Sequence, residues 1–466
     1  MIKTLTIENF KGWKNTGNMN FSPITLFMGS NSSGKSSIGQ FLMLLQQTCL
    51  SQDRRSVLYL GDKNSIVELG GPIDILYGHN PEESLKFEYK WNLSKNVEFI
   101  NSIDQKKYTV NQITFNEIIS VHDKISQTLE IEKMQYSMFN NKNFQFSAGM
   151  ERVQKASSAR AYKTITENYY LKRNNGRAWE MPSPFKFYGF PDEMINYHQN
   201  AWFAPQLNVL QEQFFNSICY LGPLRDRAQR YYRWTGNTPI SVGAAGEYTI
   251  PALLAARAEG RKYNFKAKQP LLSLESVIAQ AMKNMGLIEN FEINRISEDR
   301  QDYDVKVKTK GSPTLTDVPD VGFGISQVLP VLVQLYYAPE NSIIIMEQPE
   351  LHLHPSAQSA LADEMIRAIS ARENARPRNI QLIIETHSEH FLRRFQRRIA
   401  EKKISQDLFA AYFANNDQIP AILEPLQINL YGEIINWPKN FFGDINGDIF
   451  AQTEAALKDQ LSKVSQ

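Results

Sequence analysis

The sequence predicts an α/β protein with a mostly parallel, doubly wound sheet and a middle insertion of mixed strands and helices. Three observations support this prediction. An apolar strand at 23–28 leads through a glycine-rich loop into an amphipathic helix at 36–50. Apolar runs at 341–346 and 380–384 have the composition of strands buried on both faces. A stretch with helical spacing, 357–370, lies between them, and strands that alternate with helices are typical of parallel sheets.

The remaining elements follow from local patterns. Ile2, Leu5 and Ile7 lie among polar residues and predict a first strand. From 96 to 216 the pattern loosens, although polar and aromatic stretches there predict further strands, and we interpret this segment as an insertion with a fold of its own. The tail from Thr453 is polar and at most helical.

Composition excludes several classes of protein. The chain has 466 residues, with 51 Lys and Arg against 49 Asp and Glu, and a formal net charge of +2. Two cysteines exclude a disulfide scaffold and a four-cysteine zinc site. The start lacks the pattern of a signal peptide, and no apolar run is long enough to span a bilayer, so we expect a cytoplasmic protein without a membrane partner.

The segment from Gly29 to Ser36 matches the phosphate-binding pattern G-x-x-x-x-G-K-[ST], with a strand before it and a helix after it. Glycines let the backbone wrap a phosphate, and the N–H groups at the helix start face the anion. The predicted binding residues are Gly29, Asn31, Ser33, Gly34, Lys35, Ser36 and Ser37. Lys35 would reach the β- and γ-phosphates, and the Ser36 hydroxyl can ligate Mg²⁺. The alternative is a Gly/Ser turn that happens to precede a helix.

Acidic residues follow the buried strand at 343–347. Glu347 ends this strand, where a carboxylate can hold a nucleotide-bound Mg²⁺, and Gln348 and Glu350 come directly after it. His352 and His354 invite a zinc interpretation, but no third ligand is evident, and a loop at a protein interface is the alternative.

His387 follows the buried strand at 380–384, at the end where such sheets place groups that contact ligands. It could bond a γ-phosphate or position a water. The alternative is that Ser388 caps the next helix and that His387 only fills space.

A second anion-ready helix terminus is predicted at 320–327. Gly322 and Gly324 leave the backbone approachable, Ser326 is the predicted cap, and Pro330 is expected near the start of the helix. An ordinary capped helix is the alternative.

Two basic clusters could bind nucleic acid. Arginines interleaved with aromatic residues could bind phosphates and stack bases, or contact a partner copy or nucleotide. These residues are Arg225, Arg227, Arg230, Arg233, Tyr231, Tyr232 and Trp234. The second cluster is expected to be a solvated helix face, and it comprises Arg393, Arg394, Arg397, Arg398, Lys402 and Lys403.

Together these residues resemble the ABC-type ATPase heads of structural-maintenance-of-chromosomes proteins, related double-strand-break-repair ATPases, RecF and the overcoming-lysogenisation-defect proteins. Closer still is the resemblance to bacterial AAA-family ATPases that carry a C-terminal domain of unknown function and occur in anti-phage defence systems. The motifs that carry it are Ile7 to Lys11, Tyr220 to Arg225, Val321 to Gln327, Glu347 to Glu350, Thr386 to His390, and Ile435 to Pro438 with Phe441 and Phe442.

The resemblance implies a P-loop ABC-type ATPase head in two parts, 1–95 with the Walker A motif and 217–415 with the signature, Walker B motif and switch histidine. Residues 96–216 would be the insertion and 416–466 a C-terminal extension. In such heads two ATP molecules are sandwiched between two copies, so Gly324 and Ser326 would touch the partner's γ-phosphate. Lys11 would lie near the phosphates or adenine. His387 would be the switch histidine.

Catalysis is expected to be slow. The family's second acid, the general base for water attack, is here Gln348, and an amide cannot accept a proton at neutral pH. The alternative is a base supplied by Glu350 or Glu385.

The expected function is an ATPase, with ATP and Mg²⁺ as cofactors, that forms a homodimer or higher oligomer around ATP. It would act as a switch or clamp that controls a separate effector protein in anti-phage defence. A nuclease is the expected effector. The stretch after His387 is too short for the nuclease domain that lysogenisation-defect proteins append. The alternatives are a RecF-like repair ATPase that binds DNA directly and a scaffold that holds ATP without hydrolysis.

Overall fold

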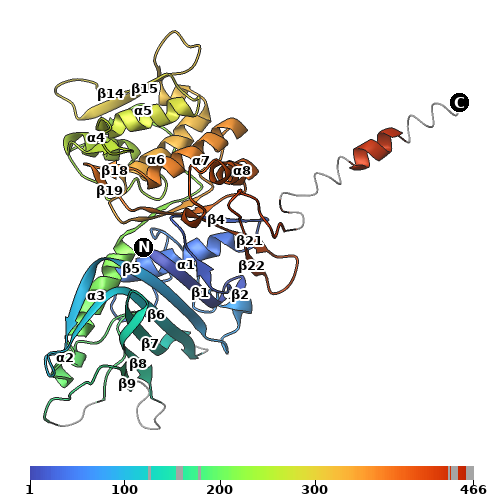
Figure 1. Cartoon of the computed structure of the whole chain (residues 1–466). Helices are drawn as coiled ribbons and strands as arrows, with labels where there is room; N and C mark the ends of the chain where they lie inside the picture. Colours follow the sequence, from blue (N-terminus) through green and yellow to red (C-terminus); the bar gives the residue numbers. More distant parts are fainter. Residues whose placement is uncertain (124–126, 154–160, 177–179, 439–440, 442–449, 458–466) are drawn as a thin grey trace.

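The computed structural model describes residues 1–123, 127–153, 161–176, 180–438, 441 and 450–457. Phe442, one of the residues that carry the family resemblance, lies outside this part. The molecule has two lobes, and a six-stranded sheet lies between them (Figure 1). Within the described residues, no helix combines the length and the apolar character that a membrane crossing requires.

The six-stranded sheet joins strands from distant parts of the chain. Its order is β10 (Ile218–Leu221), β17 (Ile343–Glu347), β20 (Gln381–Glu385), β4 (Ile24–Gly29), β21 (Phe409–Asn415) and β22 (Ile422–Pro425). Each neighbouring pair is parallel except β21 and β22. The prediction of a mostly parallel sheet therefore describes this sheet and is not confirmed for the molecule as a whole.

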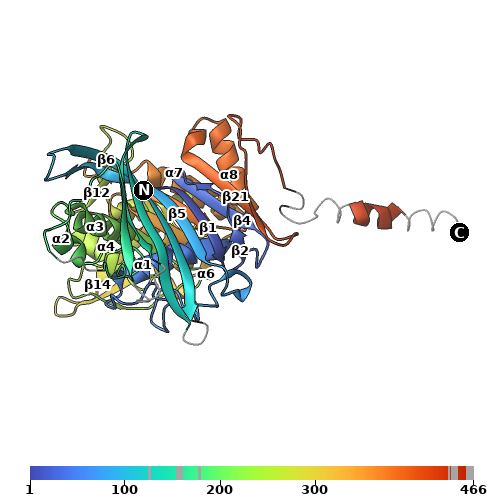
Figure 2. The same ribbon diagram turned by 90° about the horizontal axis from the view of Figure 1, so that it is seen from below.

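The other sheets are antiparallel. The eight-stranded sheet has the order β2 (Trp13–Asn15), β1 (Ile2–Phe10), β5 (Leu85–Ile100), β6 (Lys107–Asp123), β7 (Thr128–Asn140), β8 (Asn143–Arg152) and β9 (Tyr162–Glu167), with β3 (Met19–Asn20) beside β1. Figure 2 shows β1, β5 and β6 running side by side. The segment 96–216 thus continues the sheet that β1 belongs to, rather than forming a sheet separate from the N-terminal part.

Two small sheets complete the strands of the described part. They are β11 (Tyr232–Arg233), β15 (Asp302–Lys308), β14 (Asn290–Arg295) and β16 (Thr316–Asp317), and β13 (Leu272–Ser273), β12 (Lys262–Asn264), β18 (Arg372–Glu373) and β19 (Arg376–Pro377).

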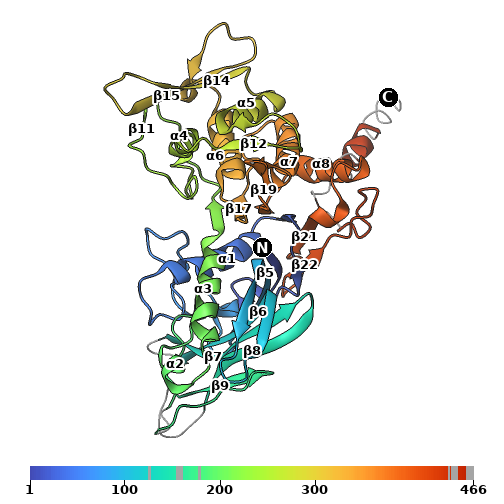
Figure 3. The same cartoon turned by 60° about the vertical axis from the view of Figure 1, so that its left-hand side comes forward.

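Helices cover both faces of the parallel sheet. The lower lobe holds α1 (Lys35–Leu50), α2 (Glu193–Tyr197) and α3 (Phe203–Asn216). The upper lobe holds α4 (Thr249–Ala258), α5 (Leu274–Asn284), α6 (Phe323–Tyr337), α7 (Pro355–Ile369) and α8 (Glu389–Ala400). Short 3-10 helices occupy Tyr77–His79, Val318–Asp320 and Gln406–Leu408. Figure 3 shows α3 leading directly into β10.

The parallel sheet is a shared wall between two hydrophobic cores, because successive side chains of a strand point to opposite faces. In β4, Leu26 and Met28 pack into the upper core with the helices α4 to α8, whereas Phe27 packs into the lower core with α1 and the antiparallel sheet. Ile344 and Ile345 divide in the same way in β17. The carboxyl ends of these strands are therefore fixed from both sides.

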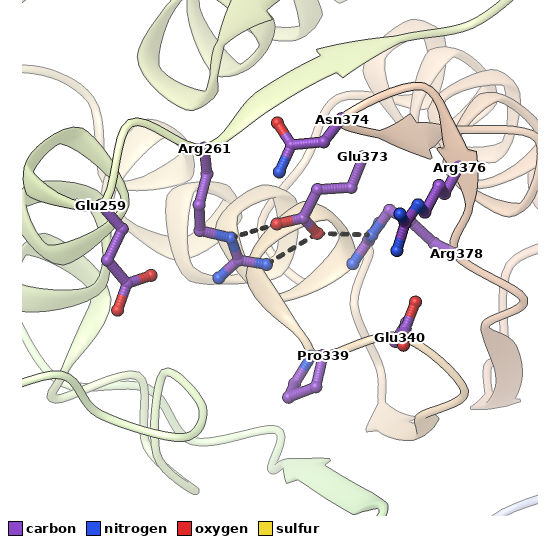
Figure 4. Close-up of a pocket in the computed structure, with 8 residues that line it drawn as sticks. All are labelled: Glu259, Arg261, Pro339, Glu340, Glu373, Asn374, Arg376 and Arg378. Carbon is purple, nitrogen blue, oxygen red and sulfur yellow. Dashed lines mark hydrogen bonds and ion pairs between the residues drawn. The ribbon is translucent and has the colours of Figure 1, made fainter.

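The carboxyl end of α6 is closed by a buried arginine. Arg378 donates to Leu335 O at 2.9 Å and to Ala338 O at 2.6 Å, carbonyl groups that have no partner further along the helix. Glu373 lies between Arg261, at 2.6 Å, and Arg378, at 3.7 Å (Figure 4). These side chains line a cavity of about 630 Å³ in the upper lobe.

Candidate nucleotide-binding site

The predicted phosphate loop lines a cavity of about 480 Å³ at the carboxyl ends of β4 and β20. Residues 31–37 form one wall, and Gly12 and Gln40 extend it. Gln348, Glu385 and His387 line the cavity as well. Three separate sequence motifs therefore meet in one place, as the phosphate-loop prediction requires.

Two glycines of the loop are required by their surroundings. Gly29 has a φ of 145°, and a Cβ there would lie 2.5 Å from Ala414 O. Gly34 has a φ of 88°, and a Cβ there would lie 3.0 Å from the ring of Trp13. The Trp13 indole also donates to Gly34 O at 2.9 Å, so the first helical turn is held from the outside.

Lys35 is buried at the base of the loop. Its Nζ donates to Gly29 O at 3.1 Å and to Ser30 O at 2.5 Å. Burial lowers the pKa of Lys35, and the charge of Glu385 opposes that shift. An ammonium surrounded by carbonyl groups and by the N–H groups at the start of α1 is prepared to exchange these contacts for phosphate oxygens.

The carboxylate that faces Ser36 is Glu385 rather than Glu347. Ser36 Oγ donates to Glu385 Oε1 at 3.0 Å. The physical reason is strand order, because β20 lies between β17 and β4, and Glu385 therefore stands beside the loop. Glu347 pairs in register with Glu385 and accepts a hydrogen bond from the Tyr220 hydroxyl at 3.0 Å. The magnesium role of Glu347 stays a prediction.

The donor set suits Mg²⁺. Ser36, Glu385 and Glu347 offer oxygen atoms only, which is what this hard cation prefers. Burial, with the charge of Glu385, raises the pKa of Glu347 to about 7, while burial is also the main cause that raises the pKa of Glu385. Two adjacent carboxyl groups with raised pKa values would be stabilised in their charged form by a bound cation. The same cation would neutralise charge on the nucleotide phosphates.

Gln348 lines the cavity in a strained backbone conformation. Its φ is 44°, which is uncommon for a residue with a side chain. Its backbone N–H donates to Glu385 O at 2.8 Å, and its carbonyl accepts from Arg225 Nη2 at 3.1 Å. The position predicted for a general base is thus occupied by an amide that faces the loop.

Glu350 lies beside the cavity rather than in its lining. Its Oε1 accepts from Thr386 Oγ1 at 2.6 Å and from the His387 backbone N–H at 3.1 Å. These bonds hold the loop of His387, so the geometry makes Glu350 an anchor of that loop, and a role as base is not supported by it.

His387 lines the cavity, as a residue that contacts a ligand would. The alternative, that Ser388 caps the next helix, also describes part of this segment. Burial and the charge of Lys35 lower the pKa of His387, which favours the neutral ring. Ser388 does cap α8, because its hydroxyl accepts from Phe391 N at 3.2 Å. Lys11 lies next to the cavity through Gln40, whose Oε1 it contacts at 2.7 Å.

The segment with Gly324 and Ser326 does not line the loop cavity. Ser326 is not the helix cap, since α6 begins at Phe323 after Gly322, and the Ser326 hydroxyl donates back to Phe323 O at 2.8 Å. Pro330 lies inside the helix, contrary to the expected place near its start.

The His-x-His motif has a structural role at this point. The His354 ring accepts from the Ser356 backbone N–H at 3.3 Å and thereby caps α7. The ring of His352 packs edge-on against Phe323 at 4.9 Å. Across the described residues no group of three or more His, Cys, Asp or Glu side chains is placed to hold a metal ion, so the zinc interpretation receives no support.

Most of the basic residues are used inside the molecule. Arg225 is buried, and Arg230 pairs with Asp320 at 2.7 Å. On α8, Arg398 pairs with Asp363 at 2.6 Å, and Arg393 with Glu389 at 3.1 Å. This helix face is therefore largely neutralised, in keeping with a solvated surface.

Sequence reasoning missed several residues of the site. Trp13 and Gln40 hold the loop and Lys11, and Tyr220 reaches Glu347 from β10. A signal existed for Tyr220, because it opens the motif Tyr220 to Arg225 that contributes to the family resemblance, and Gly222 and Pro223 follow its strand. No local pattern marks Trp13 or Gln40, because their roles depend on how β2 and α1 pack.

Comparisons with known structures give distant similarities to heads of structural-maintenance-of-chromosomes proteins. A head bound to the C-terminal winged-helix domain of ScpA has 9% identity and a TM-score of 0.41, over 92% of this chain and 98% of that chain. A head domain from Thermotoga maritima has 10% identity and a TM-score of 0.39, over 92% and 99%. A head domain from Pyrococcus furiosus, bound to the C-terminal domain of ScpA, has 9% identity and a TM-score of 0.40, over 91% of this chain and 96% of that chain. A comparison with curated proteins gave no match.

Family comparison agrees with the geometry. The family described as a protein of unknown function, DUF3696, matches residues 404–452, which confirms the predicted resemblance to ATPases with such a C-terminal domain. The family described as AAA ATPase domain matches residues 1–219 and 258–392, most of the chain, including the phosphate loop, Glu347, Gln348 and His387. The chain is a P-loop ATPase that belongs to this AAA ATPase domain family.

Proposed function

We propose that this ATPase binds ATP with Mg²⁺, pairs with a second copy around the nucleotide as ABC-type heads do, and hydrolyses ATP slowly. In this state it acts in the cytoplasm as a switch on a separate effector. Lys35, Ser36 and the backbone of 31–37 hold the phosphates. Glu385 and Glu347 complete the oxygen donors for the metal ion, and His387 senses the γ-phosphate.

One observation carries the proposal of slow turnover. The residue that faces the loop after the Walker B strand is the amide Gln348, which can orient a water but cannot take its proton. Each neighbouring carboxylate has one oxygen bound to a protein hydroxyl, because Glu385 accepts from Ser36, Glu347 from Tyr220 and Glu350 from Thr386, and neither Glu347 nor Glu350 lines the loop cavity. A site built in this way retains ATP for long periods, which suits a switch better than a motor.

The position of α6 supports the proposed pairing of two copies. Gly324 and Ser326 lie outside the loop cavity of their own chain, so that contact between this segment and a nucleotide requires another copy. The exposed Phe323 at the start of α6 gives such a copy an apolar contact.

The effector and its biological setting rest on resemblance. ATPases with the same C-terminal domain resemble components of anti-phage systems. In the matched segment, Ala414 pairs with Gly29 and the Asn416 side chain accepts from Ser30 Oγ at 2.8 Å, so this segment adjoins the start of the phosphate loop. The arginine-rich segment after β10 does not favour the RecF-like alternative, because Arg225 and Arg230 are engaged within the chain.

Solution mass with and without ATP tests the proposal. The wild type is expected to double its mass when ATP and Mg²⁺ are added, and Lys35→Ala is expected to remain at the lower mass. Lys14→Ala, which removes an exposed lysine near the loop, is the matched control and should behave as the wild type. A mass that ATP does not change would contradict the proposal and leave the ATP-bound scaffold.

The defence role has a separate test. Cells that carry this gene with its neighbouring genes are challenged with phage and compared with cells that carry Lys35→Ala. Equal plaque numbers in both would contradict a role in defence, whatever the result of the mass measurement.

A further inference from the structure

Arg225 connects two segments that belong to different parts of the site. It follows β10, and its side chain is buried, with 8% of the residue exposed. Nη1 donates to Gln327 O at 3.4 Å, in α6, and Nη2 donates to Glu347 O at 3.2 Å and Gln348 O at 3.1 Å. One guanidinium therefore joins the start of α6 to the end of β17.

The α6 end of this connection is adjacent to Ser326. Pro330 has no N–H to donate to the carbonyl four residues earlier, which is that of Ser326, and its ring crowds the same carbonyl. The first turns of α6 are therefore less tightly bonded than the rest of the helix. Gln327 O, one residue further on, accepts from Arg225 at this loosened place.

The β17 end of the connection is the strained residue Gln348. A non-glycine residue in the left-handed region persists only when its surroundings hold it there. Three bonds do so: its own N–H donates to Glu385 O, and its carbonyl accepts from Arg225 and from the Leu351 N–H. Loss of the Arg225 bond would remove the one bond of the three that comes from a side chain, and would loosen the hold on the Gln348 conformation.

Three buried polar atoms around Arg225 lack hydrogen-bond partners within the described structure. They are Arg225 Nε, Gln327 Nε2 and Glu350 Oε2, two donors and one acceptor. Buried polar atoms are rarely left unpaired, so that each such atom calls for an explanation. Burial lowers the pKa of Arg225 to about 10, and the charge of Glu350 acts against this shift. The Arg225 guanidinium and the Glu350 carboxylate are therefore within electrostatic reach of each other, and each has an atom without a hydrogen-bond partner among the described residues.

We propose that Arg225 is a positioning residue that couples the two nucleotide sites of the ATP-linked dimer. The inference rests on the proposed function, because it requires that dimer. When the start of α6 engages the partner's nucleotide, Arg225 moves with Gln327 and shifts Gln348 in its own cavity. Pairing with Glu350 Oε2 passes the same movement to the loop of His387. Arg225 lies in 220–257, between the two stretches that match the ATPase family.

The experiment measures ATP hydrolysis by the full-length protein over a range of ATP concentrations, together with the affinity for a fluorescent ATP analogue. Arg225→Lys keeps the charge, but a single ammonium cannot span carbonyl groups on two elements. We expect a Hill coefficient that falls from about 2 to about 1, the range that two coupled sites allow. Turnover should fall by about tenfold, with nucleotide affinity changed by less than about threefold.

Arg230→Lys is the matched control, since it makes the same change in the same segment at an exposed arginine. It should hydrolyse ATP as the wild type does. Pro330→Ala is a second variant, because it returns an N–H to α6 and tightens the turns beside Gln327. It should lower the Hill coefficient without loss of thermal stability. If Arg225→Lys does not fold, this variant alone tests whether the two nucleotide sites are coupled through the start of α6.

A wild-type Hill coefficient in both variants would overturn the coupling. Equal losses of affinity and turnover in Arg225→Lys would overturn it as well, because they indicate a general structural role. If the wild type shows no ATP-dependent dimer, the proposed function fails and the coupling fails with it. If the wild type dimerises and the variants stay cooperative, only the coupling is wrong.

Discussion

The two ends of α6 each receive a buried arginine, and the two arginines differ in what surrounds them. At the carboxyl end, Arg378 donates to the last carbonyl groups and lies 3.7 Å from an oxygen of Glu373. The helix dipole favours a positive charge there. At the amino end, Arg225 brings a positive charge to the end that favours negative charge, and in the described part of the chain it forms no ion pair.

This difference separates a contribution to stability from a contribution to function. Arg378 donates to the end of the helix that favours a positive charge and has Glu373 as an ion-pair partner, although its Nε, like that of Arg225, lacks a hydrogen-bond partner among the described residues. Arg225 lies at the opposite end and has no ion-pair partner among those residues, and such departures are expected at functional sites. Variants at the carboxyl end should therefore change the free energy of unfolding, and variants at the amino end should change turnover.

The largest effect is expected for Arg378→Met. The change removes the donors to two buried carbonyl groups and one partner of Glu373, and we expect the free energy of unfolding to fall by about 3 kcal/mol. Chemical denaturation measures it. Arg376→Met, at the exposed neighbour in the same cavity, is the control and should leave stability nearly unchanged. A loss as small as that of the control would show that Arg378 is no anchor.

Gln348→Glu tests the residue after β17 that Arg225 links to the amino end of α6. The new carboxylate can accept a proton from an attacking water, and we expect ATP turnover to rise by about 100-fold with little change in stability. Phosphate release measures the rate. Gln40→Glu places a carboxylate in the same cavity on α1 and should not accelerate hydrolysis. An unchanged rate in Gln348→Glu would mean that another group already acts as base.

Much of this site could be predicted from the sequence, because the signals are local. The phosphate loop needs only its glycines, Lys35 and flanking elements, and the structure places it as expected. The buried strands at 343–347 and 381–385 were recognisable from their apolar composition alone.

The rest depended on which strands are neighbours. Glu347 ends β17, but β20 lies between that strand and the loop, so Glu385 faces Ser36. Likewise, nothing in the loose pattern of 96–216 indicated that its strands would extend the sheet of β1. Strand order is a property of the whole fold, and one sequence contains no local signal for it.

Glu117 extends the comparison to a buried carboxyl group that has no hydrogen-bond partner among the described residues. It is fully buried in β6, and neither of its carboxylate oxygens has a hydrogen-bond partner in the described structure. Replacing it by methionine removes two unsatisfied atoms, and we expect unfolding to require about 2 kcal/mol more free energy at pH 7. Thermal and chemical denaturation measure the change.

The pH dependence of this effect has a definite sign. Burial raises the pKa of Glu117 well above its ordinary value of 4.5. The folded state then holds the proton more tightly, so the contribution of the protonated carboxyl is complete below about pH 4.5 and is lost as the pH rises towards the folded pKa. The advantage of Glu117→Met should therefore grow from pH 4.5 to 7. An advantage that shrinks over this interval would contradict the burial argument.

Among the three variants that remove a buried ionisable group, the smallest effect on stability is expected for Arg225→Met, and it decides whether the two ends of α6 truly differ. The variant loses three hydrogen bonds of 3.1 to 3.4 Å, but it also removes a buried charge that has no ion-pair partner among the described residues and an unpaired Nε. These terms oppose each other, and we expect a loss of about 1 kcal/mol, well below that of Arg378→Met. Its turnover should nevertheless fall, because the hold on the Gln348 conformation is loosened. A loss of stability equal to that of Arg378→Met would make both arginines structural anchors, and the case for coupling through Arg225 would then have to be abandoned.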